Sequence, residues 1–252
     1  MAGGAADKRS VAVRVFAIAD AFERGDELTL SEVARRAGLP VSTTHRLLAD
    51  WVAWGGLVRG EDGRYRIGMK LWKLGVRQPT ARRLREVALP YLEDLLDATG
   101  EHVHLAVRDG LSAVYLERLS GAGAVPIVSD VGYALPLHAT GVGLVLLAHS
   151  GPEVFEAVIG SGPRKFLPNT LTGERELRER LATIRATGIS VSIEEMTRGA
   201  FSVAAPIRDS AGDVIAAVSI IAKSERKSEP QFALGVRMAA RGISDALGFV
   251  FR

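Results

Sequence analysis

The sequence contains no cysteine among its 252 residues. A chain without thiols has no disulfide framework, no thiolate metal site and no redox cysteine. The sequence also lacks a run of about 18 apolar residues, which a membrane-spanning helix would need, and no apolar signal segment follows Met1. These absences predict a cytoplasmic protein with no membrane contact. The length is typical of about two domains.

The most informative segment is residues 28–48. Its apolar residues recur at helical spacing over residues 30–37 and are followed by Gly38, which suits the left-handed residue that ends a helix. Pro40 opens a second helix or lies just before it. We expect the hydroxyl of Ser31 to cap the first helix, although an alanine stands where a capping box would have an acid. The pattern predicts a helix-turn-helix.

The second predicted helix carries short polar and basic side chains on its first turns. Such side chains suit phosphate oxygens and base edges in the major groove of DNA. The alternative is a helix hairpin inside a larger helical domain, whose polar residues are merely solvated. The candidate DNA-contacting residues of this helix pair are Arg35, Ser42, Thr43, Thr44, His45 and Arg46.

A basic hairpin is predicted directly after the helix pair. Two short alternating segments within residues 57–67 flank the pair Asp62-Gly63, which is a strong signal for a tight turn. Arg59, Arg64 and Arg66 line this hairpin, and we count Arg64 and Arg66 among the DNA-binding candidates. The hairpin would lie along the phosphate backbone and supply affinity. A helix pair followed by a basic hairpin indicates a winged helix-turn-helix.

The charge is divided unevenly along the chain. Residues 1–85 have a net charge of +7, whereas residues 86–252 have a net charge of −4. This asymmetry is typical of a basic nucleic-acid module joined to an ordinary domain. We predict a DNA-binding domain over residues 1–75, a linker helix region over 76–99 and a second domain over 100–252.

The linker region contains a long amphipathic helix over residues 82–99, which ends at Gly100. Pro90 within it is expected to kink the helix or divide it into two pieces. The helix either packs against a partner chain or only covers the sheet of its own domain.

The second domain alternates with a period of two after Gly100, which predicts a mainly antiparallel sheet with helices against it, in an α+β fold. The predicted strands are 102–107, 112–118, 125–129, 189–193, 201–207 and 214–222, and the predicted helices are 140–149, 174–187 and 232–249.

The chain resembles the IclR family of bacterial transcriptional regulators over nearly its whole length. The blocks that carry this resemblance are residues 39–48, 65–68, 135–143, 195–199 and 203–209. The resemblance implies a C-terminal effector domain of the GAF/PAS-like kind and a homodimer or homotetramer. It also implies binding to palindromic double-stranded operator DNA and a response to a small molecule, often an organic or aromatic acid. We expect a regulator, most simply a repressor of a metabolic operon, with no cofactor, metal or catalytic residue.

The resemblance also implies where the effector binds. One wall is the start of the helix at Gly141 and Val142, whose amides favour an anion. The chain departs from members that bind small polar acids, since serines replace an aspartate and a cysteine and an isoleucine replaces a serine. The effector is therefore expected to be larger or less polar than a two- or three-carbon keto acid. The opposite wall is assigned to Ser192, Ala200, Ser202, Ser219 and Ile221.

Structural roles and a metal site are the alternatives left open for these and nearby residues, whereas a hydrolase triad is rejected. The serines can satisfy local backbone groups, and Glu195 can fix a loop. His102, His104 and His138 could form a metal site, which we do not favour. His138, Ser202 and Glu195 could be read as a hydrolase triad, but no G-x-S-x-G elbow supports a nucleophile. The alternative function is an enzyme with a DNA-binding appendage.

Overall fold

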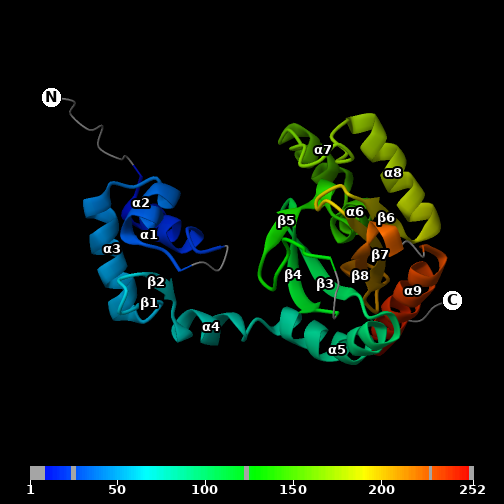
Figure 1. Ribbon diagram of the computed structural model, residues 1–252, viewed down its shortest axis with the longest axis horizontal. Helices are drawn as coiled ribbons and strands as arrows, with labels where there is room; N and C mark the ends of the chain where they lie inside the picture. Colours follow the sequence, from blue (N-terminus) through cyan, green and yellow to red (C-terminus); the bar gives the residue numbers. More distant parts are fainter. Residues whose placement is uncertain (1–8, 24–26, 122–124, 227–228, 250–252) are drawn as a thin grey trace. The chain divides into compact units, whose positions relative to one another are not determined.

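The computed structural model describes residues 9–23, 27–121, 125–226 and 229–249 (Figure 1). The chain forms two compact units, residues 1–82 and 83–252. In this described part of the chain, no helix is both long enough and apolar enough to cross a membrane.

In its described residues, the first unit contains three helices and a two-stranded hairpin, followed by a short helix. These elements are α1 (Val11–Asp20), α2 (Leu30–Ala37), α3 (Val41–Trp54), β1 (Leu57–Arg59), β2 (Tyr65–Ile67) and α4 (Met69–Gly75). Strands β1 and β2 pair antiparallel, with Val58 opposite Arg66. The predicted helix pair and hairpin are therefore confirmed.

The cap of helix α2 lies two residues before the one expected. The Thr29 hydroxyl accepts a hydrogen bond from the backbone of Glu32, whose carboxylate accepts one in return from the Thr29 backbone. This is a complete capping box, so the prediction that Ser31 caps the helix is wrong. Ser31 lies inside the helix and is exposed. The helix ends as predicted at Gly38, which has a φ of 62°.

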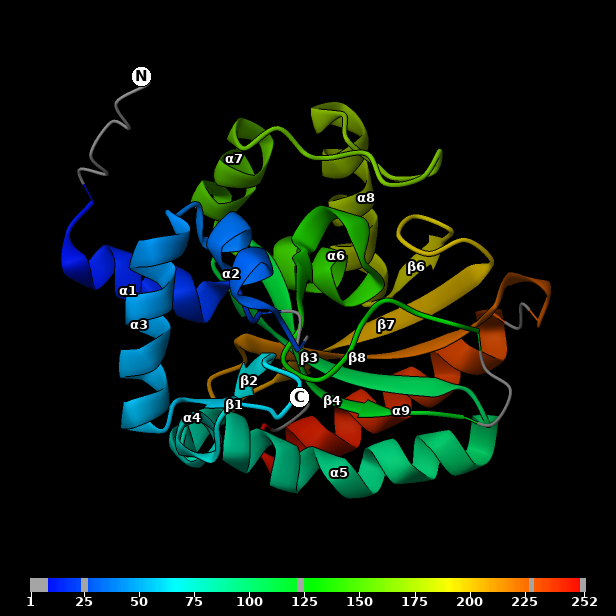
Figure 2. The ribbon, with the colours of Figure 1, turned by 60° about the vertical axis from the view of Figure 1, so that its left-hand side comes forward.

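The second unit is built on a six-stranded antiparallel sheet with the strand order β5-β4-β3-β8-β7-β6. Figure 2 shows this sheet between two groups of helices. The strands are β3 (His102–Asp109), β4 (Ser112–Leu119), β5 (Ala134–Pro136), β6 (Ser190–Ile193), β7 (Ala200–Arg208) and β8 (Val214–Lys223).

Each face of the sheet packs against its own helices. Helices α5 (Pro79–Thr99) and α9 (Glu229–Ala246) cover one face and enclose a core that includes Leu92, Phe201 and Ile220. The other face packs against α6 (Gly141–Ala148), α7 (Pro152–Gly160) and α8 (Glu174–Thr187). Because alternate residues of a strand face opposite sides, the odd-numbered residues of β3 enter the first core and its even-numbered residues face α6.

One prediction for the second unit is wrong, and another is narrowed. Residues 125–129 do not form a strand, because this segment crosses the α6 side of the sheet and contributes its Val125 carbonyl to His102 instead. Helix α5 is one continuous element through Pro90, so of the two outcomes expected there the division into two pieces does not occur, and a kink at Pro90 stays a prediction. Pro90 is exposed, where water can satisfy the carbonyl that loses its partner. Sequence reasoning also missed α7 and β5.

Candidate functional site

The exposed face of α3 carries three of the predicted DNA-contacting residues. Ser42, His45 and Arg46 are exposed, and their spacing of three and four places them on one side of the helix. Thr43 is half-buried beside them, and Arg35 is exposed in the last turn of α2. This face offers hydroxyl, imidazole and guanidinium groups to a partner.

Thr44 does not belong in the predicted set of DNA-binding residues. It is 0 % exposed, and its hydroxyl donates a hydrogen bond to the Pro40 carbonyl at 3.0 Å. Thr44 points toward the core of the unit because it lies three residues before Leu47, which is buried on the same side of the helix. It therefore holds the first turn of α3 and is not available to DNA.

The arginines of the hairpin are exposed but have acidic neighbours. Arg64 donates to the Glu27 carbonyl at 3.0 Å and lies 3.5 Å from the Glu32 carboxylate. Arg66 Nη1 lies 3.3 Å from Glu27 Oε1. Arg59 lies over the ring of Tyr65. Contact with phosphate by Arg64 and Arg66 would therefore compete with these exposed ion pairs, which are weak.

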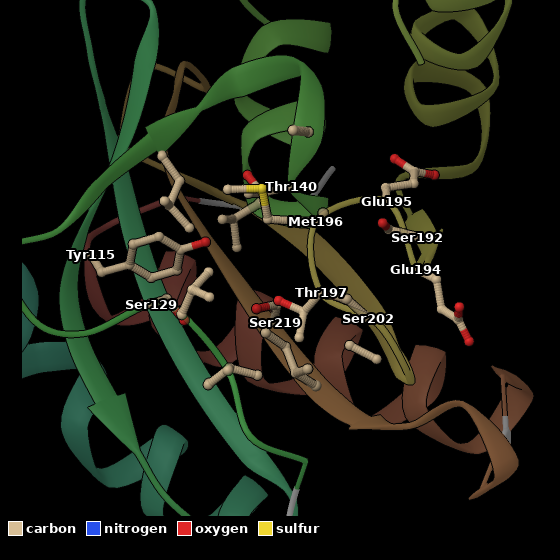
Figure 3. A pocket seen from close by; sticks show the side chains of 18 residues that line it. Tyr115, Ser129, Thr140, Ser192, Glu194, Glu195, Met196, Thr197, Ser202 and Ser219 are labelled. Carbon is tan, nitrogen blue, oxygen red and sulfur yellow. The ribbon is translucent and has the colours of Figure 1, made fainter. Parts of the chain in front are cut away.

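A pocket lies between the sheet of the second unit and the start of α6 (Figure 3). It contains about 460 Å³ of space, its open mouth included. All seven predicted effector residues line this pocket, although they come from four separate elements: Gly141, Val142, Ser192, Ala200, Ser202, Ser219 and Ile221. The remaining wall residues, which sequence reasoning did not assign, include Tyr115, Ile127, Val128, Ser129, Thr140, Met196 and Thr197.

The N-terminus of α6 forms one wall of the pocket. Thr140 caps the helix by accepting a hydrogen bond from the Gly143 amide at 3.1 Å. The amides of Gly141 and Val142 have no partner within the helix. A Cβ on Gly141 would lie 2.7 Å from Ser202 Oγ, so the glycine allows the helix to approach strand β7. The first two residues of the helix, Gly141 and Val142, thus line the pocket at the helix N-terminus.

Tyr115 extends this polar wall from strand β4. Its hydroxyl shares a hydrogen bond with the side chain of Thr140, and burial raises the pKa of the phenol. The alternation of residues 112–118 already placed Tyr115 on the same face as Ala113, and this was the signal by which it could have been found. The phenol stays neutral and polar at physiological pH.

No lysine, arginine or histidine is among the 18 residues that line the pocket. Its two carboxylates are directed elsewhere: Glu194 Oε1 accepts a hydrogen bond from Ser224, and Glu195 Oε1 lies 3.0 Å from Arg180 Nη1. Ser192 also forms a hydrogen bond with Glu195. Glu195 therefore fixes the loop between β6 and β7, which is the structural role considered for it.

The histidines considered as metal ligands have other surroundings. His138 Nε2 is 2.9 Å from the Arg164 carbonyl, and His102 Nε2 is 2.9 Å from the Val125 carbonyl. His104 is fully buried, which with the nearby charge of Arg118 lowers its pKa to about 3. Within the described ranges, no three histidine, aspartate or glutamate residues are grouped so that they could hold a metal ion.

Replacing Arg180 with alanine is expected to make stability strongly pH-dependent. Burial raises the pKa of Glu195, and Arg180 opposes this. A raised folded-state pKa means that stability is full below the ordinary pKa of 4.5 and is lost as the pH rises through the raised value. Without Arg180, the free energy of unfolding should be about 2 kcal/mol lower than that of the wild type at pH 8, and the difference should be smaller near pH 5. Urea unfolding at the two pH values measures this difference.

The matched control is Arg175→Ala on the same helix. Arg175 is exposed and lies 3.7 Å from Glu179, so its loss should cost less than about 0.5 kcal/mol at either pH. Equal losses for the two variants, with no dependence on pH, would contradict the role given to Arg180.

Comparison with known proteins assigns both units to one family. The family model described as "IclR helix-turn-helix domain" matches residues 11–60, and the model "Bacterial transcriptional regulator IclR C-terminal" matches residues 79–245.

Similar proteins support the same assignment. The chain is 33% identical to the HTH-type transcriptional regulator XynR of Escherichia coli K12 over 94% of this chain and 96% of XynR. It is 34% identical to the transcriptional repressor AllR of the same strain, over 89% and 84% of the two chains. Its fold is similar to the crystal structure of an IclR homologue from Microbacterium hydrocarbonoxydans in complex with 4-hydroxybenzoate. The TM-score is 0.86 and the identity is 39%, over 94% of this chain and 99% of the homologue.

Proposed function

This chain belongs to the IclR family of bacterial transcriptional regulators, and from that premise we propose that it is a repressor that responds to an aromatic carboxylic acid. The first unit binds double-stranded operator DNA, and the second binds the acid in the pocket beside α6. It acts in the cytoplasm, where the operator lies.

The observation that carries this proposal is the pocket beside the N-terminus of α6. A helix N-terminus favours a carboxylate, because its amides lack partners and the helix dipole is positive there. The hydroxyl-bearing residues Tyr115, Ser202 and Ser219 also line the pocket and can supply further hydrogen bonds. Among the described residues that line the pocket none has a cationic side chain, so the amides are the main attraction for the anion.

The apolar part of the pocket favours an aromatic acid. Val142, Ala200 and Ile221 present hydrocarbon to the interior, which an aromatic ring can bury and a small keto acid cannot. The Microbacterium homologue was crystallised with 4-hydroxybenzoate, an acid of this class. We propose an effector of the same chemical class for this chain.

Helix α5 is the proposed route from the pocket to DNA. It runs from the end of the first unit into the core of the second, where Leu84, Leu92 and Leu95 are buried. The acid would favour one arrangement of the units, and α5 would alter the spacing of the recognition helices. Paired half-sites about one helical turn apart tolerate little displacement, and a coupling of about 1–3 kcal/mol is enough for regulation.

We propose that the protein acts as a homodimer or homotetramer, because two copies are needed to read a palindrome. The first unit exposes large apolar side chains that suit contact with a second copy. They include Val11, Phe16, Met69, Trp72 and Leu74.

The alternative is an enzyme with a DNA-binding appendage. The absence of cysteine excludes thiol chemistry, and His138 is held by the Arg164 carbonyl rather than by Ser202. We therefore assign no catalytic residue and no cofactor. Incubation of the protein with 4-hydroxybenzoate should return the acid unchanged by chromatography.

The pocket assignment is tested by calorimetric titration of the full-length protein with benzoate, 4-hydroxybenzoate and pyruvate. The aromatic acids should bind and raise the melting temperature, since a ligand that binds only the folded state stabilises it, whereas pyruvate should bind more weakly. Tighter binding of pyruvate, or no binding of the aromatic acids at millimolar concentration, would contradict the proposal.

A further inference from the structure

The segment of residues 125–131 forms one wall of the pocket and belongs to no helix or strand. We call this segment the strap. Its residues Ile127, Val128 and Ser129 line the pocket, and Ser129 lies on the other side of it from Ser192 (Figure 3). No backbone–backbone hydrogen bond joins residues 125–129 to another segment among the residues that the structure describes. The position of the strap therefore depends on side chains from the sheet.

Two side chains of the sheet hold the strap by its carbonyl groups. His102 Nε2 is 2.9 Å from the carbonyl of Val125, and Arg118 Nη1 donates to the carbonyl of Ser129 at 3.0 Å. Because a carbonyl only accepts, Nε2 carries the proton of the His102 imidazole. Val125 and Ser129 are both buried. The strap is thus fixed at two points, four residues apart.

The residues between these two points form an apolar wall. Val128 is 51% exposed although it lines the pocket, and Ile127 is half-buried beside it. An aromatic ring in the pocket can cover such side chains and bury their apolar surface. The contact between ring and wall then depends on how firmly the strap is held.

Arg118 is the stronger of the two anchors. A hydrogen bond from a charged donor is stronger than one between neutral groups. The guanidinium also lies 3.7 Å from the carboxylate of Asp130 on the strap, and the same carboxylate accepts a hydrogen bond from the Val131 amide at 2.8 Å. Arg118 itself is not among the residues that line the pocket, so it acts on a ligand only through the strap.

We propose that Arg118 is a positioning residue for the effector, which fixes the strap, sets the width of the pocket and restricts the effector to acids with a single ring. This inference rests on the proposed binding of an aromatic acid. A wall that is already ordered does not have to be ordered by the ligand, and this favours affinity for an acid that fits. A wall that cannot retreat excludes a second fused ring by steric clash.

The test compares the affinities of the full-length protein for benzoate and for 2-naphthoate, a fused two-ring acid, by calorimetric titration. The wild type should bind benzoate at least about tenfold more tightly than 2-naphthoate. Arg118→Met keeps the length of the side chain but removes its donors. This variant should bind benzoate about tenfold more weakly than the wild type does, and the ratio of the two affinities should come close to one.

Three further variants define the role of the arginine. Arg118→Lys keeps a charged donor for the Ser129 carbonyl and should retain part of the preference for benzoate. Val128→Ala shortens the strap wall at an exposed position and should shift the ratio in the same direction as Arg118→Met. The matched control is Arg108→Met, which removes an exposed arginine of β3 that donates to the Gly110 carbonyl at 3.2 Å, and it should leave the ratio unchanged.

Hydrogen exchange separates positioning of the strap from a general loss of stability. In Arg118→Met the amides of residues 125–131 should exchange faster than in the wild type, whereas those of β7 and β8 should keep their wild-type rates. Benzoate should slow exchange in the strap of the wild type, because the bound ring packs against it.

Two results would overturn the inference while leaving the proposed function intact. One is an unchanged ratio of affinities in Arg118→Met, whether both affinities fall or neither does, and the other is wild-type binding of 2-naphthoate as tight as that of benzoate. Should Arg118→Met fail to fold, wild-type ratios in both Arg118→Lys and Val128→Ala would overturn it. Failure of both acids to bind the wild type would overturn the proposed function as well.

Discussion

Replacing Arg46 with alanine is expected to weaken binding to operator DNA by about 10- to 100-fold. Arg46 is exposed on the same face of α3 as Ser42 and His45, which is the face that a recognition helix turns toward the major groove. Its guanidinium can bond a guanine edge or a phosphate. Fluorescence anisotropy with a duplex selected by the wild-type protein from a randomised pool measures the loss.

Two variants control for charge and for folding. Arg175→Ala removes the same charge from an exposed site on α8 and should leave operator affinity within about twofold. Thr44→Val removes a hydroxyl that is bonded to the Pro40 carbonyl inside the helix, and it should also leave affinity nearly unchanged. Wild-type affinity in Arg46→Ala, or a large loss in Thr44→Val, would mean that α3 does not contact DNA with this face.

Replacing Gly143 with alanine is expected to lower the melting temperature of the full-length protein by at least about 5 °C. The added Cβ would lie 2.5 Å from Thr140 Oγ1 and 2.7 Å from the Cα of Leu137. The second contact is with backbone, so the first turn of α6 must shift. Because that turn forms a wall of the pocket, binding of aromatic acids should weaken as well.

Gly160→Ala is the matched control for this glycine. Gly160 lies in the last turn of α7 with nothing within 4 Å of an added Cβ, and alanine is the better helix former by about 1 kcal/mol. This variant should keep or raise the melting temperature and bind acids as the wild type does. A stable Gly143→Ala protein that binds acids normally would contradict the close approach at α6. Calorimetry measures both quantities.

The sequence predicted the local parts of both sites well. Residues 28–67 have strong local signals, namely helical spacing, a glycine at a helix end and an Asp-Gly turn. The segment that carries each signal forms the helix, helix end or hairpin that was predicted. The seven pocket residues come from the family resemblance, and they lie together because β6, β7, β8 and α6 meet at one place.

Contacts between distant segments could not be predicted in this way. Whether Thr44 is buried or exposed depends on how α3 is oriented about its own axis, and the polar composition of the helix does not determine this orientation. The segment 125–129 has apolar residues suited to a strand, but its carbonyls bond to the side chains of His102 and Arg118 and not to a neighbouring strand.

The central claim is that an acid in the second unit changes DNA binding by the first. Its most direct test is the affinity for the selected duplex, measured by anisotropy with and without saturating 4-hydroxybenzoate. We predict that the acid weakens binding by about 5- to 150-fold, and that the duplex weakens binding of the acid by the same factor. Equal DNA affinities for the free and the acid-bound protein would contradict the account.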